Sequence, residues 1–209
     1  KAYAYMLAQK LGTAQSMVDT ALEIDKDHLR TQLEQVRLLM IKQDFSAADQ
    51  LIAKLQKKFP NNYRVLKRSG DLAFARGQFD KAAALFQESN SLSAQSETTA
   101  ALGKALWKAG KGTQMQTTLH SWLEVYPNDR AIRFQLAQGY LLMGNRSGAI
   151  SELEILLESN PEDTKILNFL AWQLKDDDIG TAKTYAEKAY ALAPRHPQII
   201  DTLGTIALM

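Results

Sequence analysis

Cysteine is absent from this 209-residue chain, and proline and histidine are scarce, with five and three residues. Without cysteine there is no disulfide framework, no thiolate zinc site and no cysteine nucleophile. The three histidines are far apart in the sequence, and no cluster with metal-ligand spacing accompanies them. We therefore expect no metal site and no histidine-dependent catalysis. No apolar run approaches the ~20 residues that span a bilayer, so no transmembrane segment is predicted.

Motifs for catalysis and nucleotide binding are also missing. The chain has no P-loop, no glycine motif for dinucleotides and no nucleophile elbow. The acidic run Asp176-Asp177-Asp178 lacks the glycine and the final glutamate of a calcium loop, so a polar turn is the better interpretation. We expect no cofactor and no enzymatic activity.

Apolar residues make up 45% of the chain and charged residues 23%, which predicts a folded protein with ample core material. The formal net charge is only +2, but its distribution is uneven. Residues 29–111 carry 14 Lys and Arg against 7 Asp and Glu, whereas residues 112–209 carry 8 against 12. The middle of the chain is therefore expected to prefer anionic partners. An ordinary solvated surface with uneven charge is an equal alternative.

A repeat of 33 or 34 residues organises the whole chain. A small or apolar residue recurs with this step, at Ala14, Ala48, Ala82, Met115, Ala149 and Ala182. Four of the five prolines follow such a residue by twelve positions, and three glycines precede one by five. Each period holds two amphipathic helical patterns joined by a short polar turn, most clearly in 130–163. Neither helix could bury its apolar stripe alone, so each unit needs neighbours of the same kind.

The period and the residues at its fixed positions resemble the tetratricopeptide repeat, whose pattern is W-x2-L-G-x2-Y…A-x3-F…P. Repeat 63–95 shows Gly70, Phe74, Ala82 and Phe86 at motif positions, whereas Met115 replaces the usual small residue in repeat 96–129. The resemblance implies an all-α fold, a right-handed α-α superhelix of helix–turn–helix repeats. It also implies a non-catalytic scaffold for protein–protein interaction. Met115 implies slightly wider helix packing in its repeat.

One array is expected to cover residues 1–209, with complete repeats at 29–62, 63–95, 96–129, 130–163 and 164–196. Residues 1–28 are expected to hold the tail of one helix and a complete second helix, and 197–209 the first helix of a further repeat. Because neither end has a polar capping helix, we expect a fragment of a longer protein whose ends can self-associate.

Two segments carry a narrower resemblance. LNFLAW at 167–172 and PQIIDTLG at 197–204 are similar to units of the tetratricopeptide lipoprotein of the bacterial PEP-CTERM/exosortase system. This resemblance implies an extracytoplasmic, membrane-tethered protein that acts in export or exopolysaccharide assembly.

The architecture of the superfamily places positions 2, 5, 9 and 12 of each first helix on the concave side of the array. In this chain those positions carry mainly cations in the first half and large aromatic residues from the middle onward. The expected partner-binding residues are Arg30, Arg37, Arg64, Lys67, Lys104, Trp107, Phe134, Gln138, Asn168 and Trp172. Such a wall suits an acidic protein or peptide segment with one or two apolar anchors. Trp122, by contrast, is expected in the core.

Other interpretations stay open. The aromatic residues can be ordinary packing and the cations ordinary solvated groups. The array can also be a structural spacer attached to a catalytic or membrane-anchored domain outside this sequence. Nucleic-acid binding has only the basic segment in its favour, and the net charge of +2 argues against it. A clamp for a C-terminal carboxylate is not expected, because Asp71 next to Lys67 on the same stripe would repel the carboxylate.

Overall fold

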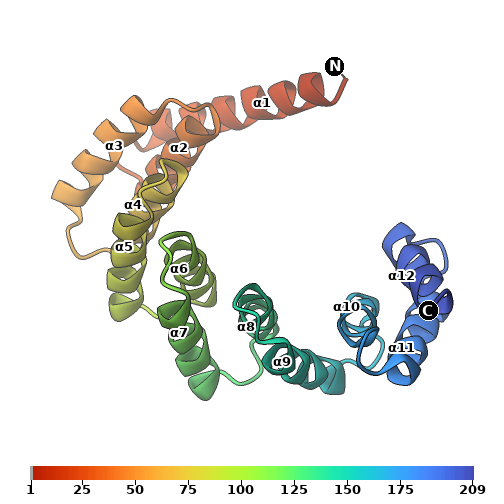
Figure 1. Ribbon diagram of the computed structural model, residues 1–209. Coiled ribbons are helices and arrows are strands. Elements are labelled where there is room, and N and C mark those ends of the chain that lie inside the picture. Colours follow the sequence, from red (N-terminus) through yellow and green to blue (C-terminus); the bar gives the residue numbers. More distant parts are fainter. Residues whose placement is uncertain (1) are drawn as a thin grey trace. The chain divides into compact units, whose positions relative to one another are not determined.

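The computed structural model describes residues 2–209, with side chains from Lys10 onward (Figure 1). This part of the chain contains twelve α-helices and no strand. The helices are α1 (Ala2–Ile24), α2 (Leu29–Ile41), α3 (Phe45–Lys58), α4 (Tyr63–Ala75), α5 (Phe79–Leu92), α6 (Ser96–Lys108), α7 (Gly112–Val125), α8 (Arg130–Leu142), α9 (Arg146–Ser159), α10 (Thr164–Leu174), α11 (Ile179–Leu192) and α12 (Pro197–Ala207). The all-α helix–turn–helix architecture predicted from the repeat is confirmed.

The chain forms two compact units, Lys1–Lys111 with α1–α6 and Gly112–Met209 with α7–α12. The division falls between α6 and α7, within the turn of the predicted repeat 96–129. Each unit is described by itself below, and a single array over 1–209 stays a prediction.

Three of the turns inside repeats contain a glycine with positive φ, at Gly77, Gly110 and Gly144. Their φ values are 73°, 76° and 77°, in the left-handed region that only glycine enters without strain. Gln43 occupies the equivalent place between α2 and α3 with φ 62°. A side chain is thus accepted at this position at some cost in backbone energy. These three glycines therefore mark where α4, α6 and α8 end.

The repeat 164–196 is one residue shorter, because α10 has eleven residues where α2, α4, α6 and α8 have thirteen. Its turn to α11, residues 175–178, is one residue longer than the other turns inside repeats and contains no residue with positive φ. The backbone N–H of Asp178 bonds to the carbonyl of Leu174 at 2.8 Å instead. The Asp178 carboxylate then caps α11 by accepting from the Thr181 hydroxyl at 2.6 Å and from its N–H at 3.0 Å. These bonds hold the pKa of Asp178 below its usual value. The acidic run is a polar turn, as its sequence indicates.

The first helix differs from its prediction. Residues 1–28 are expected to contain a helix end and a second helix, but α1 is one helix from Ala2 to Ile24. The repeat phase would put the turn near Gln9, where the other repeats have glycine or Gln43. No positive φ occurs there, and the local sequence MLAQKL contains good helix formers without a breaker. The expected side chains Tyr3, Tyr5 and Met6 lie outside the residues whose side chains the structure describes.

The core of the first unit lies between the two helices of each pair. One cluster joins α2, α3 and α4, through Leu33, Val36, Ala48, Ile52, Leu55, Val65 and Leu72. In the next pair, Phe86 of α5 is buried with its ring against Gly70 of α4. A Cβ at Gly70 would lie 2.6 Å from the ring Cε1 of Phe86. The glycine is therefore needed for this close approach, which explains the motif positions Gly70 and Phe86.

In the second unit, Met115 of α7 and Gly139 of α8 fit together in the same manner. A Cβ at Gly139 would lie 2.5 Å from the Met115 Cε atom. The longer side chain at this repeat position is thus accommodated by a glycine opposite, whereas the sequence indicated only wider packing. Further along the unit, the small residues Ala171, Ala182 and Ala186 are fully buried where α10 and α11 pack closely.

Trp122 of α7 is only partly in the core. Its ring lies 4.3 Å from that of Tyr126, and its Nε1–H donates to Asp129 at 2.9 Å. Asp129 also caps α8 by accepting from the Ile132 N–H. The tryptophan therefore packs against its own helix and fixes the carboxylate that starts the next one.

Candidate binding pocket on α2, α4 and α6

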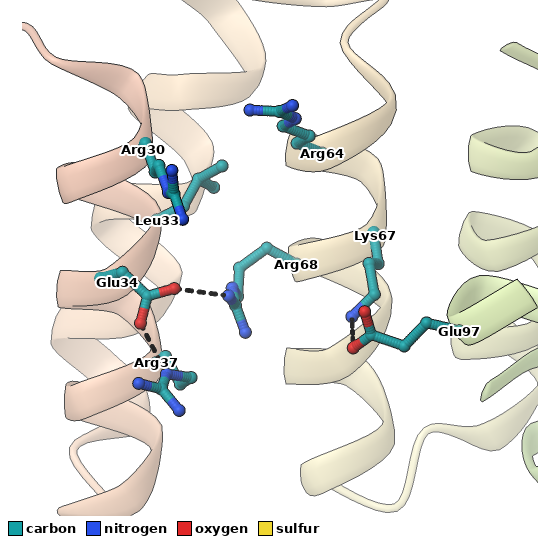
Figure 2. A pocket seen from close by; sticks show the side chains of 8 residues that line it. All are labelled: Arg30, Leu33, Glu34, Arg37, Arg64, Lys67, Arg68 and Glu97. Carbon is teal, nitrogen blue, oxygen red and sulfur yellow. Dashed lines mark hydrogen bonds and ion pairs between the residues drawn. The ribbon is translucent and has the colours of Figure 1, made fainter. Parts of the chain in front are cut away.

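The first helices of three successive repeats, α2, α4 and α6, line a pocket of about 560 Å³ in the first unit (Figure 2). Its lining residues are Arg30, Leu33, Glu34, Arg37, Arg64, Lys67, Arg68 and Glu97. Spacings of three and four residues along α2 and α4 place these side chains on one face of each helix. Four of the ten predicted partner-binding residues, Arg30, Arg37, Arg64 and Lys67, are brought together here.

The pocket is rich in positive charge, and Leu33 is the one apolar residue among those that line it. Five of its eight side chains are cationic, two are carboxylates, and Leu33 is buried. An acidic group entering the pocket would meet several guanidinium and ammonium donors at once. Arginine forks are suited to carboxylate and phosphate oxygens, because they can donate two parallel hydrogen bonds.

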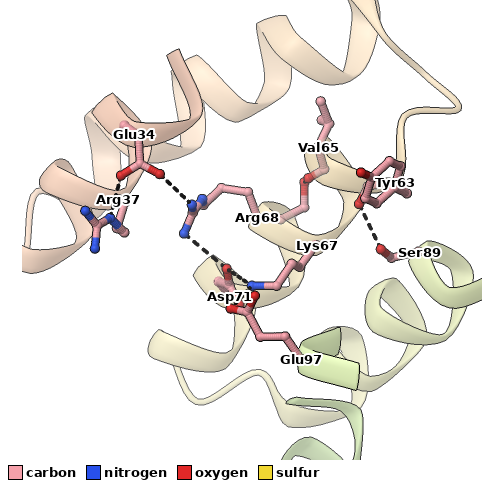
Figure 3. A network of polar contacts seen from close by, with 10 residues as sticks. Glu34, Arg37, Tyr63, Val65, Lys67, Arg68, Asp71, Ser89 and Glu97 are labelled. Carbon is pink, nitrogen blue, oxygen red and sulfur yellow. Dashed lines mark hydrogen bonds and ion pairs between the residues drawn. The ribbon is translucent and has the colours of Figure 1, made fainter. Parts of the chain in front are cut away.

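Three of the cations are held by carboxylates of the protein itself (Figure 3). Glu34 accepts from Arg37 at 2.7 Å and lies 3.4 Å from Arg68. Asp71 of α4, which is not among the lining residues, lies 3.2 Å from Arg68 and 3.3 Å from Lys67. The network joins neighbouring first helices and fixes Arg68, whose side chain is 17% exposed. The Nε–H of Arg68 is buried and has no acceptor among the described residues.

Lys67 also reaches Glu97 of α6, at 3.0 Å. The Glu97 side chain is 83% exposed, so this pair is weak and easily exchanged for another anion. Lys67 is nevertheless already matched by Asp71 on its own helix. Asp71 thus lies beside the Lys67 ammonium, and the absence of a carboxylate clamp there stays a prediction.

Arg30 and Arg64 differ from the other cations, because neither has an ion pair with a described carboxylate. Both are exposed, and both are the second residue of their helix, α2 and α4 respectively. A cation in the first turn opposes the helix dipole and costs about 0.3–1 kcal/mol. Arg64 gains some support from Tyr63, whose hydroxyl accepts from its Nε at 2.8 Å. The sequence thus places two unmatched cations where they do not favour the helix.

Sequence reasoning missed Glu34 and Arg68, which form the centre of the network. Each is the sixth residue of its helix, whereas the predicted concave positions are 2, 5, 9 and 12. A signal was available, because the two residues are 34 positions apart, one full repeat, and carry opposite charge. Opposite charges at the same repeat position in adjacent units indicate an ion pair between adjacent first helices.

The remaining predicted residues lie outside this pocket. Lys104 is exposed and Trp107 half-buried, both on α6. In the second unit, Phe134 of α8 packs edge-on against Phe169 of α10 at 5.7 Å, and the Lys165 Nζ lies 4.1 Å from its ring.

Three further predicted residues belong to the same helices of the second unit. Gln138 of α8 is exposed, and Trp172 of α10 is 43% exposed with the Lys175 Nζ 5.1 Å from its ring. Asn168 of α10 has a buried Oδ1 without a described partner. These residues form an aromatic and polar set on α8 and α10. A wall shared with the basic pocket stays a prediction.

A second hollow of about 270 Å³ lies between α3, α4 and α5. Its polar groups are largely satisfied, since Arg76 pairs with Asp49 and Gln56 donates to Ser69 at 3.1 Å. Lys81 is its one lining cation without an ion pair among the described residues, so the hollow holds less unmatched charge than the pocket on the first helices. Among the described residues, no group of His, Cys, Asp or Glu side chains could hold a metal ion. None of the described helices is long and apolar enough to cross a bilayer.

Comparisons with known proteins agree with this architecture. A family model described as "Tetratricopeptide repeat" matches residues 33–96. No curated protein sequence matches the chain. Among solved structures, PilW, described as a widely conserved type IV pilus biogenesis factor, is similar with a TM-score of 0.73 and 16% identity. That match covers 97% of this chain and 94% of PilW.

Two further solved structures show the same fold. PilF of Pseudomonas aeruginosa is similar with a TM-score of 0.67 and 17% identity, covering 97% of this chain and 93% of PilF. YrrB, described as a TPR protein with an unusual peptide-binding site, gives a TM-score of 0.61 and 17% identity, covering 88% of this chain and 96% of YrrB. Identities this low support a common fold and nothing finer.

Proposed function

Since the chain is a tetratricopeptide repeat protein, we propose that it is a non-catalytic scaffold whose α2/α4/α6 pocket binds an acidic, extended segment of a protein partner. Proteins of this fold act as platforms for protein and peptide partners, and YrrB is described as having a peptide-binding site. The observation that carries the proposal is the pocket itself. It gathers five cations from successive repeats, and two of them, Arg30 and Arg64, have no ion pair with a carboxylate of the described residues.

The electrostatics favour an acidic segment over other partners. Arg30, Arg37 and Arg64 are all exposed, so a ligand can reach them without moving the core. Anionic groups would be attracted over distances of about 8–10 Å at ordinary salt. The binding energy would come from charge-assisted hydrogen bonds to arginine forks. Phe134 and Trp172, on α8 and α10 of the second unit, are proposed separately as aromatic anchors for a partner.

The export or exopolysaccharide role, with extracytoplasmic membrane tethering, is a further proposal. It rests on the resemblance of segments 167–172 and 197–204 to the lipoprotein of exosortase systems. PilW is described as a pilus biogenesis factor, but at 16% identity this adds only the fold.

Neutralising three exposed cations is expected to weaken binding of acidic peptides by about 10- to 100-fold, at roughly 0.5–1 kcal/mol for each lost contact. The variant is Arg30→Gln/Arg37→Gln/Arg64→Gln. The probes are two peptide libraries of equal length, one with Asp or Glu at alternate positions and one with Lys or Arg there. Affinity is measured by fluorescence anisotropy at two salt concentrations, and the acidic library should bind more weakly at higher salt.

The matched control removes three exposed lysines of the same unit that lie outside the pocket, in Lys54→Gln/Lys57→Gln/Lys108→Gln. It should bind the acidic library as the unchanged protein does. Equal losses in the two variants would mean that only net charge matters. No preference for acidic over basic peptides would refute the pocket and leave the spacer interpretation.

A further inference from the structure

Two of the five cations in the pocket have no ion pair with a carboxylate of the described residues. Arg37 is matched by Glu34, and Lys67 and Arg68 are matched by Asp71 and Glu97. Arg30 and Arg64 have no carboxylate partner among the described side chains. Figure 2 shows both at the same end of the pocket, on the facing helices α2 and α4. An anion at this end would therefore see a local excess of two charges.

Other arginines in the first turns of helices are matched by acids. Arg130, at the start of α8, pairs with Asp163 at 2.7 Å and donates to the Leu156 carbonyl. Arg146, at the start of α9, pairs with Asp177 at 2.8 Å. These pairs neutralise the unfavourable interaction between a cation and the helix N-terminus. Arg30 and Arg64, one repeat apart, lack such compensation, which indicates that an external anion supplies it.

The neighbouring residue Tyr63 holds the guanidinium of Arg64 in place. Its Nε donates to the Tyr63 hydroxyl at 2.8 Å, and the guanidinium carbon lies 5.4 Å from the Tyr63 ring centroid. The backbone carbonyl of Tyr63 in turn accepts from the Ser89 hydroxyl at 2.8 Å (Figure 3). The two terminal nitrogens of Arg64 stay available as a fork. A planar fork fixed in this manner loses little freedom when it binds oxygen atoms.

We propose that Arg30 and Arg64 bind the phosphate group of a phosphorylated side chain within the partner segment. This inference rests on the proposed function and names the chemical group that the pocket selects. A phosphate monoester carries a charge of about −1.5 to −2 and three acceptor oxygens, which match two charges and two forks. A single carboxylate carries one charge and would leave one arginine unmatched.

The acids of the pocket add to this selection. Glu34 already accepts from Arg37 and lies beside Arg68, so a second carboxylate entering there would meet a negative charge. A compact dianion would instead be bound by Arg30 and Arg64, at the end of the pocket where Figure 2 shows both side chains. Arg68 extends from α4 toward α2 (Figure 2), and its terminal nitrogens are already engaged by Glu34 and Asp71, so Arg30 and Arg64 remain the cations for the ligand.

The test compares three peptide libraries that differ only at a fixed central residue, which is phosphoserine, glutamate or serine. Phosphoserine peptides are expected to bind at least about 10-fold more tightly than glutamate peptides, because the phosphate brings a second charge to the two forks. Arg30→Gln/Arg64→Gln should abolish the preference and bind both peptides equally. Arg30→Lys/Arg64→Lys, which keeps the charges but not the forks, should lose part of it. Lys54→Gln/Lys57→Gln removes two exposed charges outside the pocket and should keep it.

The outcomes separate this inference from the proposed function. If glutamate and phosphoserine peptides bind equally and both depend on Arg30 and Arg64, the phosphate inference is wrong and the acidic pocket stands. If no acidic or phosphorylated peptide binds, both are wrong. Inorganic phosphate is titrated in parallel by the same competition assay. Competition by inorganic phosphate at the concentration of the peptide itself would overturn a phosphorylated side chain as the ligand.

Discussion

Replacing Phe86 by alanine is expected to destabilise the first unit by about 3–5 kcal/mol, the range for deleting a buried aromatic ring. Phe86 is 1% exposed, and its ring fills the space that Gly70 leaves open on α4. The helices α4 and α5 could not close over the resulting cavity without moving the first helices that line the pocket. The loss is therefore expected to weaken peptide binding as well as stability.

Gly70, which faces the ring of Phe86, allows a second test of the same contact. In Gly70→Ala the new Cβ would lie 2.6 and 2.7 Å from two ring atoms of Phe86, which overpacks the core at a cost of about 1–3 kcal/mol. The better helix propensity of alanine offsets up to about 1 kcal/mol of this. Adding Phe86→Leu should relieve the clash, so the double variant should be more stable than the sum of the single losses predicts.

These changes are measured by urea unfolding and by hydrogen exchange of the amides in α4 and α5. Gly12→Ala is the control, because nothing lies within 4 Å of a Cβ there, so it should raise helix stability. An additive double variant, or a Gly70→Ala protein as stable as the Gly12→Ala protein, would contradict the contact.

Breaking the Arg133–Glu152 ion pair is expected to destabilise the second unit by about 2–3 kcal/mol. This is less than the loss of one partner from a fully buried ion pair, which costs about 3–5 kcal/mol. The atoms are 2.6 Å apart, and the side chains are only 12% and 14% exposed. Arg133 also donates to the Pro127 carbonyl at 2.8 Å, so it joins α8, α9 and the preceding turn. Arg133→Met leaves the largely buried Glu152 carboxylate without its partner, which is the costly state.

A double replacement distinguishes the contribution of the two charges from that of side-chain packing. Arg133→Met/Glu152→Leu removes both charges and should recover most of the stability, because two apolar side chains can fill the same space. Thermal unfolding at pH 7 of both single variants and the double variant gives the coupling energy. Arg195→Met, at an exposed residue of the same unit, should unfold as the unchanged protein does. A double variant no more stable than the worse single variant would show that the charges themselves stabilise this region.

The sequence was sufficient to predict the helices and much of the turn geometry. Three of the six recurring small or apolar residues follow a glycine by five positions, and these glycines, Gly77, Gly110 and Gly144, have positive φ, because the left-handed conformation restricts the residue type. Gly70 and Phe86 were identified as motif positions, and the structure shows their close contact. Local steric requirements of this kind restrict the residue type at a position, so they can be predicted from a single sequence.

Features that depend on contacts between repeats were harder to predict. The Glu34–Arg68 pair joins residues one repeat apart, and only a comparison of the same position in adjacent repeats would indicate it. The continuous helix α1 was missed because the repeat phase suggested a turn that the local sequence does not support. Of the predicted partner-binding residues, Arg30, Arg37, Arg64 and Lys67 line one pocket, whereas the aromatic residues Phe134 and Trp172 belong to the other unit.

Mapping an acidic peptide on the protein by backbone amide chemical shifts tests the central claim most directly. The account predicts saturable shifts concentrated in α2, α4 and the start of α6, and their loss in Arg30→Gln/Arg37→Gln/Arg64→Gln. Shifts centred instead on α3 and α5 around the second hollow, or unchanged by these substitutions, would contradict the account.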